Sequence, residues 1–232
     1  MPVVYLIPAL LAEDALEAIP AYVLDSIKNC QVFFVENERT TRRYFKQLWP
    51  EMIIDNYEWV NMKDENQSLS FFKKAIKENK NIGIISEAGC PGIADPGQKI
   101  IAAAQEMGIV VTPLVGPSSI LLALMASGMS GQQFHFHGYL PIENHQRTKN
   151  IKELEADSTQ QNCTQIFIET PYRNAQLLEA ICKTCKSDTR ICIAVDITGK
   201  NEWIKTMPVS EWQKTKPEIH KIPAIFLLYA GN

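Results

Sequence analysis

Ser86-Glu-Ala-Gly-Cys-Pro-Gly-Ile-Ala-Asp-Pro-Gly97 is a glycine- and proline-rich loop that follows a short apolar run, Asn81–Ser86. The run is typical of a buried strand, and Asp95-Pro96 is typical of a helix start with Asp95 as the cap. In wound α/β sheets, ligands bind at the carboxyl ends of parallel strands. Glycines allow a ligand to approach the backbone and prolines stiffen a loop, so local chemistry favours a ligand site and a ligand-free stiff turn about equally.

Strands and helices alternate around this loop in the first half of the chain. Strands are expected at Val3–Ile7, Cys30–Val35, Asn81–Ser86 and Ile109–Thr112. Helices are expected at Ala15–Lys28, Thr40–Leu48, Ser68–Asn79 (capped by Ser68 or Ser70) and from Asp95 to Gly108. Such alternation predicts a mostly parallel sheet wound with helices on both faces.

The second half has a different order of elements. Helices are expected at Ile120–Ser127 and Pro171–Lys186, and strands at Phe134–Leu140, Thr164–Glu169, Arg190–Asp196, Trp203–Met207 and Ala224–Tyr229. Neighbouring strands without a helix between them indicate a mixed sheet. We therefore predict two α/β domains, residues 1–114 and residues 115–232.

Composition limits the class of protein. The chain has 232 residues, 46% hydrophobic and 21% charged, which is ordinary for a soluble globular protein. We expect no membrane span, because no apolar run reaches about 18 residues, and the N-terminus has no basic leader, so we expect a cytoplasmic protein. The formal net charge of −3 gives no global sign of nucleic-acid binding, so such a partner would need a local basic patch.

Cysteines and histidines do not predict a metal site. Six cysteines are scattered, and the only close pair, Cys182 and Cys185, has no second pair at ligand spacing. We interpret them as reduced thiols packed against the core. His135 and His137 alternate along a predicted strand and share one face, but no third ligand is evident, so we expect no metal.

Two further segments also join a strand to a helix. Leu114-Val-Gly-Pro-Ser-Ser119 offers hydroxyls and free backbone amides to a polar ligand, or only a helix cap at Ser118. Phe167-Ile-Glu-Thr-Pro-Tyr-Arg173 places Glu169 near Arg173, as a catalytic pair or as a structural brace.

In this order, the three segments resemble the tetrapyrrole (corrin/porphyrin) methylase superfamily, which consists of class III S-adenosylmethionine-dependent methyltransferases. They are most similar to its branch that methylates a ribose 2′-hydroxyl of 16S ribosomal RNA. That branch has a Ser-Asp-Ala-Gly-Thr-Pro-x-Ile-x-Asp-Pro-Gly loop, matched here with Glu87 for Asp and Cys90 for Thr. Further family segments resemble Val35–Arg39, Leu114–Gly128, Gly138–Pro141 and Ile168–Arg173.

The resemblance implies a homodimer of two-domain α/β subunits, with S-adenosylmethionine in the cleft between the domains and S-adenosylhomocysteine as the product. It implies donor contacts from Pro8, Ser86, Glu87, Ala88, Gly89, Ile93, Asp95, Ser118, Ser119, Glu169, Thr170, Asp196 and Ala224. The reaction is an in-line attack on a sulfonium methyl, for which the protein supplies alignment and a dry site and needs no metal. Candidates for a base that takes the acceptor's proton are Glu36, Glu169 and Asp196.

Departures from the branch put the acceptor in doubt. The branch has Pro-Thr-Pro-Ile-Gly-Asn-Leu after its first strand, whereas this chain has Ile7-Pro-Ala-Leu-Leu-Ala-Glu13, without the glycine. Pro223-Ala224 replaces a Gly-Glu pair ahead of the last strand, and the helical tail of longer members does not follow Asn232. Three hypotheses remain open: a methyltransferase acting on RNA, one acting on a tetrapyrrole or other small molecule, and a donor-binding protein without turnover.

One local basic feature suits an RNA substrate. Arg39, Arg42, Arg43 and Lys46 are spaced so that a helix would gather much of their charge on one side, with Tyr44 nearby to stack on a base. The alternative is a solvated helix face. We assign Arg39, Arg42, Arg43 and Arg173 as candidate substrate-binding residues, with RNA or the small ribosomal subunit as the partner.

Overall fold

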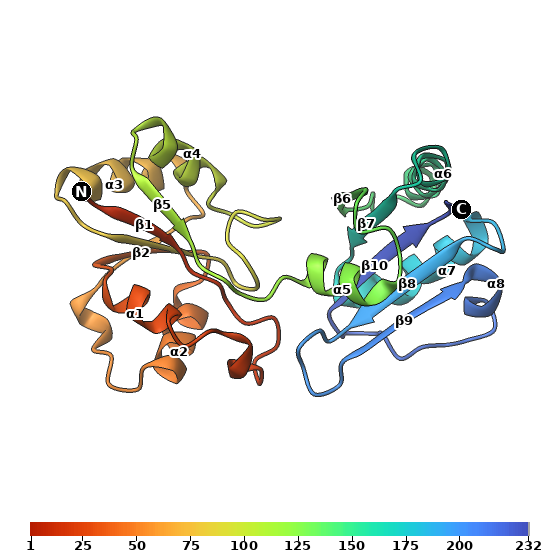
Figure 1. The fold of residues 1–232 in the computed structure, drawn as a ribbon, viewed down its shortest axis with the longest axis horizontal. Helices are drawn as coiled ribbons and strands as arrows, with labels where there is room; N and C mark the ends of the chain where they lie inside the picture. Colours follow the sequence, from red (N-terminus) through yellow and green to blue (C-terminus); the bar gives the residue numbers. More distant parts are fainter. Residues whose placement is uncertain (232) are drawn as a thin grey trace. The chain divides into compact units, whose positions relative to one another are not determined.

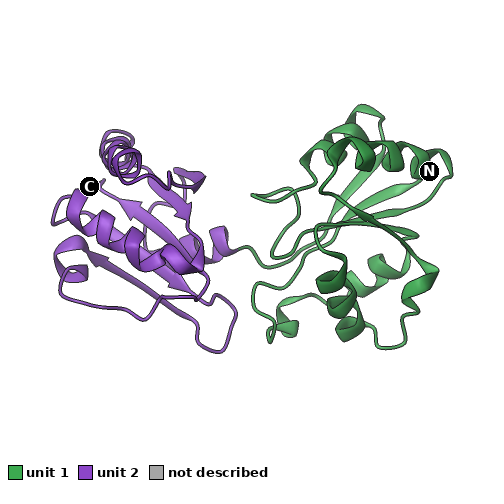
Figure 2. Ribbon diagram, turned by 180° about the vertical axis from the view of Figure 1, so that it is seen from behind, with its two compact units in different colours: residues 1–118 green, residues 119–232 purple. Residues whose placement is uncertain are grey.

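The computed structural model describes residues 1–231 and divides the chain into two compact units, Met1–Ser118 and a second unit that begins at Ser119 (Figure 2). The sequence predicts a division after Leu114, and the units divide after Ser118. Each unit contains one five-stranded sheet (Figure 1). The predicted α/β class is therefore confirmed.

The first unit is built on a fully parallel sheet. Its strands are β1 (Val3–Leu6), β2 (Val32–Val35), β3 (Glu58–Asn61), β4 (Ile82–Ile85) and β5 (Val110–Pro113), in the order β3-β2-β4-β1-β5. One face carries α1 (Val23–Lys28) and α2 (Glu38–Leu48), and the other carries α3 (Glu65–Lys77) and α4 (Gln98–Glu106) (Figure 1).

The right-handed rule for parallel crossovers explains this division of the helices. The connections from β1 to β2 and from β2 to β3 move across the sheet in one direction, and those from β3 to β4 and from β4 to β5 move in the other. Because every crossover is right-handed, a connection that moves in the reverse direction across the sheet puts its helix on the opposite face. Helices α3 and α4 therefore lie on the face opposite α1 and α2. Alternate residues of β2 accordingly enter different cores: Phe33 packs with Phe45 of α2, and Phe34 packs with Phe72 of α3.

The second unit has a mixed sheet, as the sequence predicts. Its strands are β6 (Phe134–Tyr139), β7 (Thr164–Ile168), β8 (Arg190–Val195), β9 (Trp203–Pro208) and β10 (Ala224–Tyr229), in the order β6-β7-β10-β8-β9. Strand β6 pairs with β7 in parallel, whereas β10 is antiparallel to both of its neighbours and β9 is antiparallel to β8.

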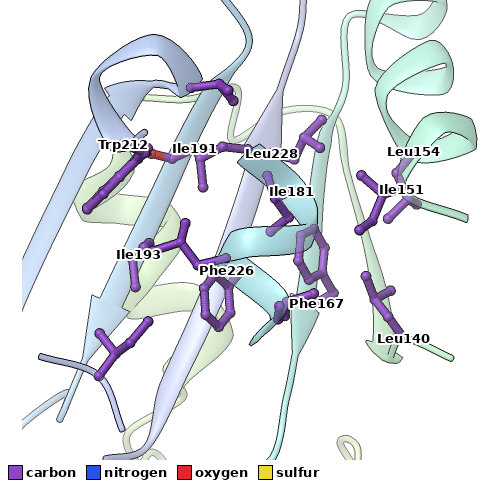
Figure 3. Packing of buried hydrophobic residues seen from close by; sticks show 14 of the residues in the cluster. Leu140, Ile151, Leu154, Phe167, Ile181, Ile191, Ile193, Trp212, Phe226 and Leu228 are labelled. Carbon is purple, nitrogen blue, oxygen red and sulfur yellow. The ribbon is translucent and has the colours of Figure 1, made fainter. Parts of the chain in front are cut away.

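Helices cover both faces of this second sheet. The side chains of α6 (Asn144–Gln161) and α7 (Asn174–Thr184) pack on one face, where Ile151, Leu154 and Ile181 meet the stacked rings of Phe167 and Phe226 (Figure 3). Helix α5 (Ser119–Ser127) crosses the other face, where the Thr206 hydroxyl of β9 donates to its last carbonyl at 2.7 Å. The short helix α8 (Val209–Trp212) completes the unit, with Trp212 donating its indole N–H to the carbonyl of Ile191.

Several predicted helix starts are wrong, each for a local reason. The expected helix Ala15–Lys28 is interrupted at Pro20, between a 3₁₀ turn (Leu16–Ala18) and α1, because proline lacks the N–H and its ring clashes with the preceding turn. Helix α3 begins earlier than expected and is capped by Asp64, which accepts from the Gln67 amide at 3.0 Å. Ser68 is instead buried and donates to the carbonyl of Asp64.

Other differences involve Asp95 and elements that the sequence does not predict, among them a 3₁₀ turn (Ile54–Asn56) before β3. Helix α4 begins after Gly97, not at an Asp95 cap, and a 3₁₀ turn (Pro171–Arg173) precedes α7. Strand β3 was not predicted because Val60 is its only buried residue. Helix α6 was missed because it is mostly polar, and α8 because it is one turn long. Within residues 1–231, no helix is long and apolar enough to cross a membrane.

Gly83 is the tightest point of the first sheet. A Cβ atom at this position would lie 2.6 Å from the Ile7 side chain and 2.7 Å from the Phe33 ring, both of which are fully buried. Gly83→Ala should therefore lower the free energy of unfolding by about 1–3 kcal/mol, the usual cost of overpacking a core. The matched control is Gly131→Ala, since a Cβ there would meet nothing within 4 Å. Urea denaturation measures both, and equal losses in the two variants would contradict the packing argument.

Candidate functional site

The carboxyl end of β4 is the point where connections leave the first sheet in opposite directions. Both neighbours of β4, β1 and β2, lead to helices on one face, whereas β4 leads to α4 on the other face. Divergent connections open a crevice beside the strand end, and wound α/β sheets bind ligands there. The loop Ser86–Gly97 follows β4 directly and occupies this position.

The backbone of this loop adopts an unusual conformation. Four of its residues have positive φ, and three of them are glycines: Gly89 (68°), Gly92 (79°) and Gly97 (116°). The fourth is Ala94 (64°), and the left-handed conformation costs a residue with a Cβ atom roughly 1–2 kcal/mol. Held strain of this kind is found at functional sites more than in ordinary turns, which favours the ligand-site reading of the loop.

Three loops that are distant in sequence meet at this edge of the sheet. After β1, the Ala9 amide donates to the Gly89 carbonyl at 2.8 Å. A Cβ on Gly116, which follows β5, would lie 2.0 Å from the Cβ of Pro8, so only glycine permits this approach. The Cys90 thiol lies 3.6 Å from the Pro117 carbonyl. The loops after β1, β4 and β5 therefore form one packed group.

Helix α2 supports the start of the β4 loop. The Glu36 carboxylate accepts from the Glu87 amide at 3.0 Å, and the Thr40 hydroxyl donates to the Glu87 carboxylate at 3.2 Å. The buried Tyr44 hydroxyl donates to the Pro8 carbonyl at 3.0 Å, and burial raises the pKa of this phenol. Tyr44 is therefore not available to stack on an RNA base, and that part of the sequence interpretation is wrong.

A cavity of about 150 Å³ opens between these segments. The β1 loop, α2 and the first residues of the β4 loop line it; they include Ala9, Leu10, Leu11, Thr40, Tyr44, Ser86, Glu87 and Ala88. Small-molecule sites usually enclose about 300–1,000 Å³, so this cavity has room for part of a ligand only. Leu10 and Leu11 belong to the segment that departs from the family, and the Leu11 side chain would lie 3.4 Å from a Cβ at Gly89.

Asp95 lies in an unfavourable electrostatic environment. Partial burial and the nearby carboxylate of Glu36 raise its pKa to about 6, while a hydrogen bond with Ser86 acts in the opposite direction. Glu87 adds a further negative charge. The β4 loop thus carries several acidic groups that would attract a cationic or hydrogen-bond-donating part of a ligand.

The second unit gathers its predicted residues at one edge of its own sheet. Since β7 and β8 are parallel to each other and β10 is antiparallel to both, the ends of β7 and β8 lie beside the start of β10. Ala224 pairs with Val195, and Ile225 pairs with Ile168. Glu169, Thr170, Asp196 and Ala224 therefore share this edge, and Ser119 begins α5 of the same unit.

Glu169 is the most unusual of these residues. It is 4% exposed, and its Oε1 atom accepts from the Thr170 amide at 2.6 Å and from the Arg173 Nε and Nη2 atoms at 3.0 and 2.6 Å. Its buried Oε2 atom has no hydrogen-bond partner among the described residues. The Glu169–Arg173 pair is thus a brace in which one buried carboxylate oxygen accepts no hydrogen bond from the described residues.

The other two candidate bases are held by their own surroundings. The Asp196 carboxylate accepts from the Asn201 amide at 3.1 Å and fills the space beside Gly199, so it closes a turn in which Asp196 itself has a φ of 50°. Glu36 holds the Glu87 amide, as described above. These contacts suit positioning roles, and the assignment of a base to Glu36, Glu169 or Asp196 stays a prediction.

The predicted basic patch on α2 is partly neutralised. Arg42 pairs with Glu38 and lies over the Trp59 ring, with its guanidinium carbon 5.1 Å from the ring centroid. Arg43 pairs with Glu13 at 2.5 Å, and Lys46 donates to the carbonyls of Pro50 and Met52. Arg39 is exposed and has no ion pair within residues 1–231. Arg173 is occupied by Glu169.

Cysteine and histidine side chains form no metal centre in the part of the chain that is described. All six cysteines are free, and Cys30, Cys163 and Cys192 are buried. His137 is engaged with Gln165 at 2.6 Å. Cys182 and Cys185 pack against the core of the second unit, which is consistent with their interpretation as packed thiols.

Comparisons with known proteins agree with this arrangement. The family model described as Tetrapyrrole (Corrin/Porphyrin) Methylases matches residues 12–213. The chain belongs to this family. The resemblance inferred from the three segments is thereby confirmed, and so is the prediction that the chain is a methyltransferase.

Individual relatives are consistent with the family. The ribosomal RNA small subunit methyltransferase I of Bacillus subtilis is 31% identical over 211 residues, covering 91% of this chain and 69% of that protein. The protein of the same name from Vibrio cholerae is 27% identical, covering 90% and 70%. Among solved structures, the methyltransferase CobJ has a TM-score of 0.63 at 14% identity, covering 98% of this chain and 92% of that one, which shows a shared fold. The expected donor cleft between the domains stays a prediction.

Some residues of the site cannot be predicted from the sequence. Thr40, Leu10 and Leu11 line the cavity of the first unit, and the buried Asn174 holds the loop before β10 by donating to the carbonyls of Ile219 and Ile222. The position of Leu10 and Leu11 directly after β1 was the available signal. Nothing in the local sequence of Asn174 indicates its partners, which lie 45 and 48 residues away.

The raised pKa of Asp95 predicts a pH-dependent stability. Between about pH 4 and pH 6 the folded chain holds a proton on Asp95 that the unfolded chain has lost, so stability falls as pH rises through that window. Asp95→Asn removes the charge, so it should raise the unfolding midpoint at pH 7.5 and lose that advantage below pH 4. Thermal denaturation across pH measures the difference. A difference that does not change with pH would contradict the assignment.

Proposed function

We propose that this chain transfers a methyl group from S-adenosylmethionine to a ribose hydroxyl of ribosomal RNA in the small subunit. The observation that carries the proposal is the strained Ser86–Gly97 loop, packed with the β1 and β5 loops at the divergent end of β4. The names of the relatives, which act on small-subunit ribosomal RNA, support the choice of acceptor.

The residues present fit such a donor. The β4 loop offers the polar groups of Ser86 and Glu87 in the lining of a small cavity, and Asp95 lies near Glu36 and Glu87. Glu169 has a buried carboxylate oxygen without a hydrogen-bond partner among the described residues. S-adenosylmethionine has amino and hydroxyl groups, which are suitable donors for acceptors of either kind. We assign Pro8, Ala88, Gly89, Ile93, Ser118, Ser119, Thr170, Asp196 and Ala224 as its further contacts.

The chain's own contribution to the reaction is alignment. The bound donor supplies an activated methyl group, so the protein needs no metal or covalent intermediate. Pro8 and Gly116 fix the position of the β1 and β5 loops, and Glu36 and Thr40 fix the start of the β4 loop. Holding the two reactants in line accounts for much of the rate of such transfers.

Transfer of labelled methyl groups tests the proposal. The chain should label isolated small ribosomal subunits or their RNA, and nuclease treatment should release the label as a 2′-O-methylated nucleotide. Label on a porphyrinogen in place of RNA would assign a tetrapyrrole acceptor. Calorimetric binding of S-adenosylmethionine with no labelled acceptor would assign a binding protein without turnover, and no binding of the donor or its demethylated product would refute the proposal.

Glu169 gives a sharper test of the donor site. Glu169→Gln keeps the shape of the side chain but removes the charge opposite Arg173 and changes the oxygen available to the ligand. Its donor affinity should fall about tenfold, as expected for the loss of a buried charge-assisted hydrogen bond. Glu211→Gln, an exposed change in the same unit, is the control and should bind like the unaltered chain. Equal affinities in a folded Glu169→Gln variant would remove Glu169 from the donor site.

Arg39 is the cation of the α2 patch that is most available to RNA phosphates. Arg39→Gln should weaken RNA association and reduce the dependence of log K on log salt by about one unit, whereas Arg42→Gln should change the slope less because Arg42 is paired and packed on Trp59. Filter binding at several salt concentrations measures the slopes. Identical slopes in the Arg39→Gln variant and the unaltered chain would exclude this patch.

We also propose a homodimer, in the cytoplasm where ribosomal RNA is processed. Leu121 and Met125 lie one turn apart on α5 and are 52% and 79% exposed, which is unusual for large apolar side chains on an apolar helix. Burial of this face against a second copy would remove it from water. Analytical ultracentrifugation tests the proposal, and a monomer at micromolar concentration would refute it.

A further inference from the structure

The first turn of α6 contains a buried arginine without an acidic partner. Arg147 is 6% exposed, and no carboxylate within residues 1–231 pairs with its guanidinium. One of its Nη atoms donates to Asn144 on the same helix, and its buried Nε atom has no hydrogen-bond partner. Buried charges are normally paired, so this guanidinium lacks the counter-charge that its burial requires.

The position of Arg147 in the first turn of α6 makes its unpaired charge less favourable still. The amides at a helix N-terminus carry a partial positive charge, so a cation in the first turn is unfavourable there. Helix α6 has 18 residues, no acidic residue in its first turn, and no side-chain cap from Glu143 at its N-cap position. The helix amides and the guanidinium therefore place positive charge at the same end of α6, where the side chain of the acidic N-cap residue Glu143 makes no capping hydrogen bond.

A groove between α6 and α7 includes residues of this first turn in its lining. It has a volume of about 460 Å³ and is lined by polar residues of both helices: Asn144, Arg147, Thr148, Gln176, Glu179 and Lys183, with Ala180 and Thr184. Glu179 is paired with Lys183, so the positive charge of Arg147 is not balanced within the lining. No residue assigned to the methyl-transfer site belongs to this groove.

We propose that the α6–α7 groove is a binding site for a phosphate group. A phosphate oxygen suits helix N-terminal amides, and the guanidinium hydrogens of Arg147 that are not bonded to Asn144 are charged donors for such an oxygen. The Lys183 ammonium and the Thr184 hydroxyl lie within the same lining and supply further donors, whereas the Thr148 hydroxyl already donates to the Asn144 carbonyl at 2.8 Å. The phosphate belongs either to a free anion or nucleotide or to the backbone of an RNA chain, since both present the same oxygens.

Calorimetry with the full chain distinguishes these sources. Inorganic phosphate and a short oligoribonucleotide are first titrated separately at constant ionic strength, and the phosphate titration is then repeated with the oligoribonucleotide present. Saturable binding of phosphate with no competition by the oligoribonucleotide indicates a free anion, and competition indicates an RNA phosphodiester; either result supports the site. The absence of saturable binding of both probes would overturn the proposal.

Variants locate the binding. Arg147→Met should weaken the binding of the active probe at least tenfold, whereas Lys149→Met, an exposed change on the same helix, should leave it unchanged. Lys183→Met, at a side chain that is 73% exposed, should fold normally and weaken binding several-fold, so the test does not depend on the stability of the Arg147 variant. Unchanged affinity in both Arg147→Met and Lys183→Met would overturn the site.

S-adenosylmethionine affinity separates this site from the methyl-transfer site. All three variants should bind the donor like the unaltered chain, because their positions lie outside the donor contacts. Failure of the chain to bind the donor at all would refute the proposed function and leave the phosphate measurements intact.

Discussion

The site in the first unit depends on the position of β4 between two strands whose connections leave toward the opposite face. Right-handed crossovers require this divergence once the order β3-β2-β4-β1-β5 is set. The divergence opens space at the end of β4, and the loops after β1, β4 and β5 close around it. Pro8 against Gly116 and Ala9 against Gly89 are the contacts that fix how closely they approach. The chemistry of Ser86, Glu87 and Asp95 is therefore a consequence of strand order.

Strands and the buried sides of helices could be read from the sequence because they depend on local patterns. An apolar run such as Asn81–Ser86 identifies a buried strand by its composition alone, and β4 (Ile82–Ile85) lies within this run. The errors arise where local patterns are overruled or absent. Pro20 interrupts a helix whose apolar spacing continues through it, Asp64 competes successfully with Ser68 as a cap, and the polar helix α6 has little apolar periodicity to detect.

The sequence predicts which segments form the candidate site, but it does not predict the contacts of their side chains. Glycine and proline spacing identified Ser86–Gly97, but the neighbours of Glu36 and Asp95 come from strand order, which the sequence does not state. Arg42 and Arg43 illustrate the same limit for charge. A run of basic residues predicts a positive surface, whereas Glu38 and Glu13 neutralise much of it in the folded chain. The Arg42–Glu38 pair is local, four residues apart on one helix, whereas the Arg43–Glu13 pair joins segments 30 residues apart, and a single sequence does not show such a pair.

The two units are continuous segments, and the chain passes from one to the other only once, between Ser118 and Ser119. A single crossing has a genetic consequence, because one junction is enough to separate the two halves or to exchange one of them. The two sheets also have their own cores, without strands contributed by the other half. Recombination at this junction would give a family a direct means of joining one half to a different companion, and so of acquiring new specificities without redesigning either core.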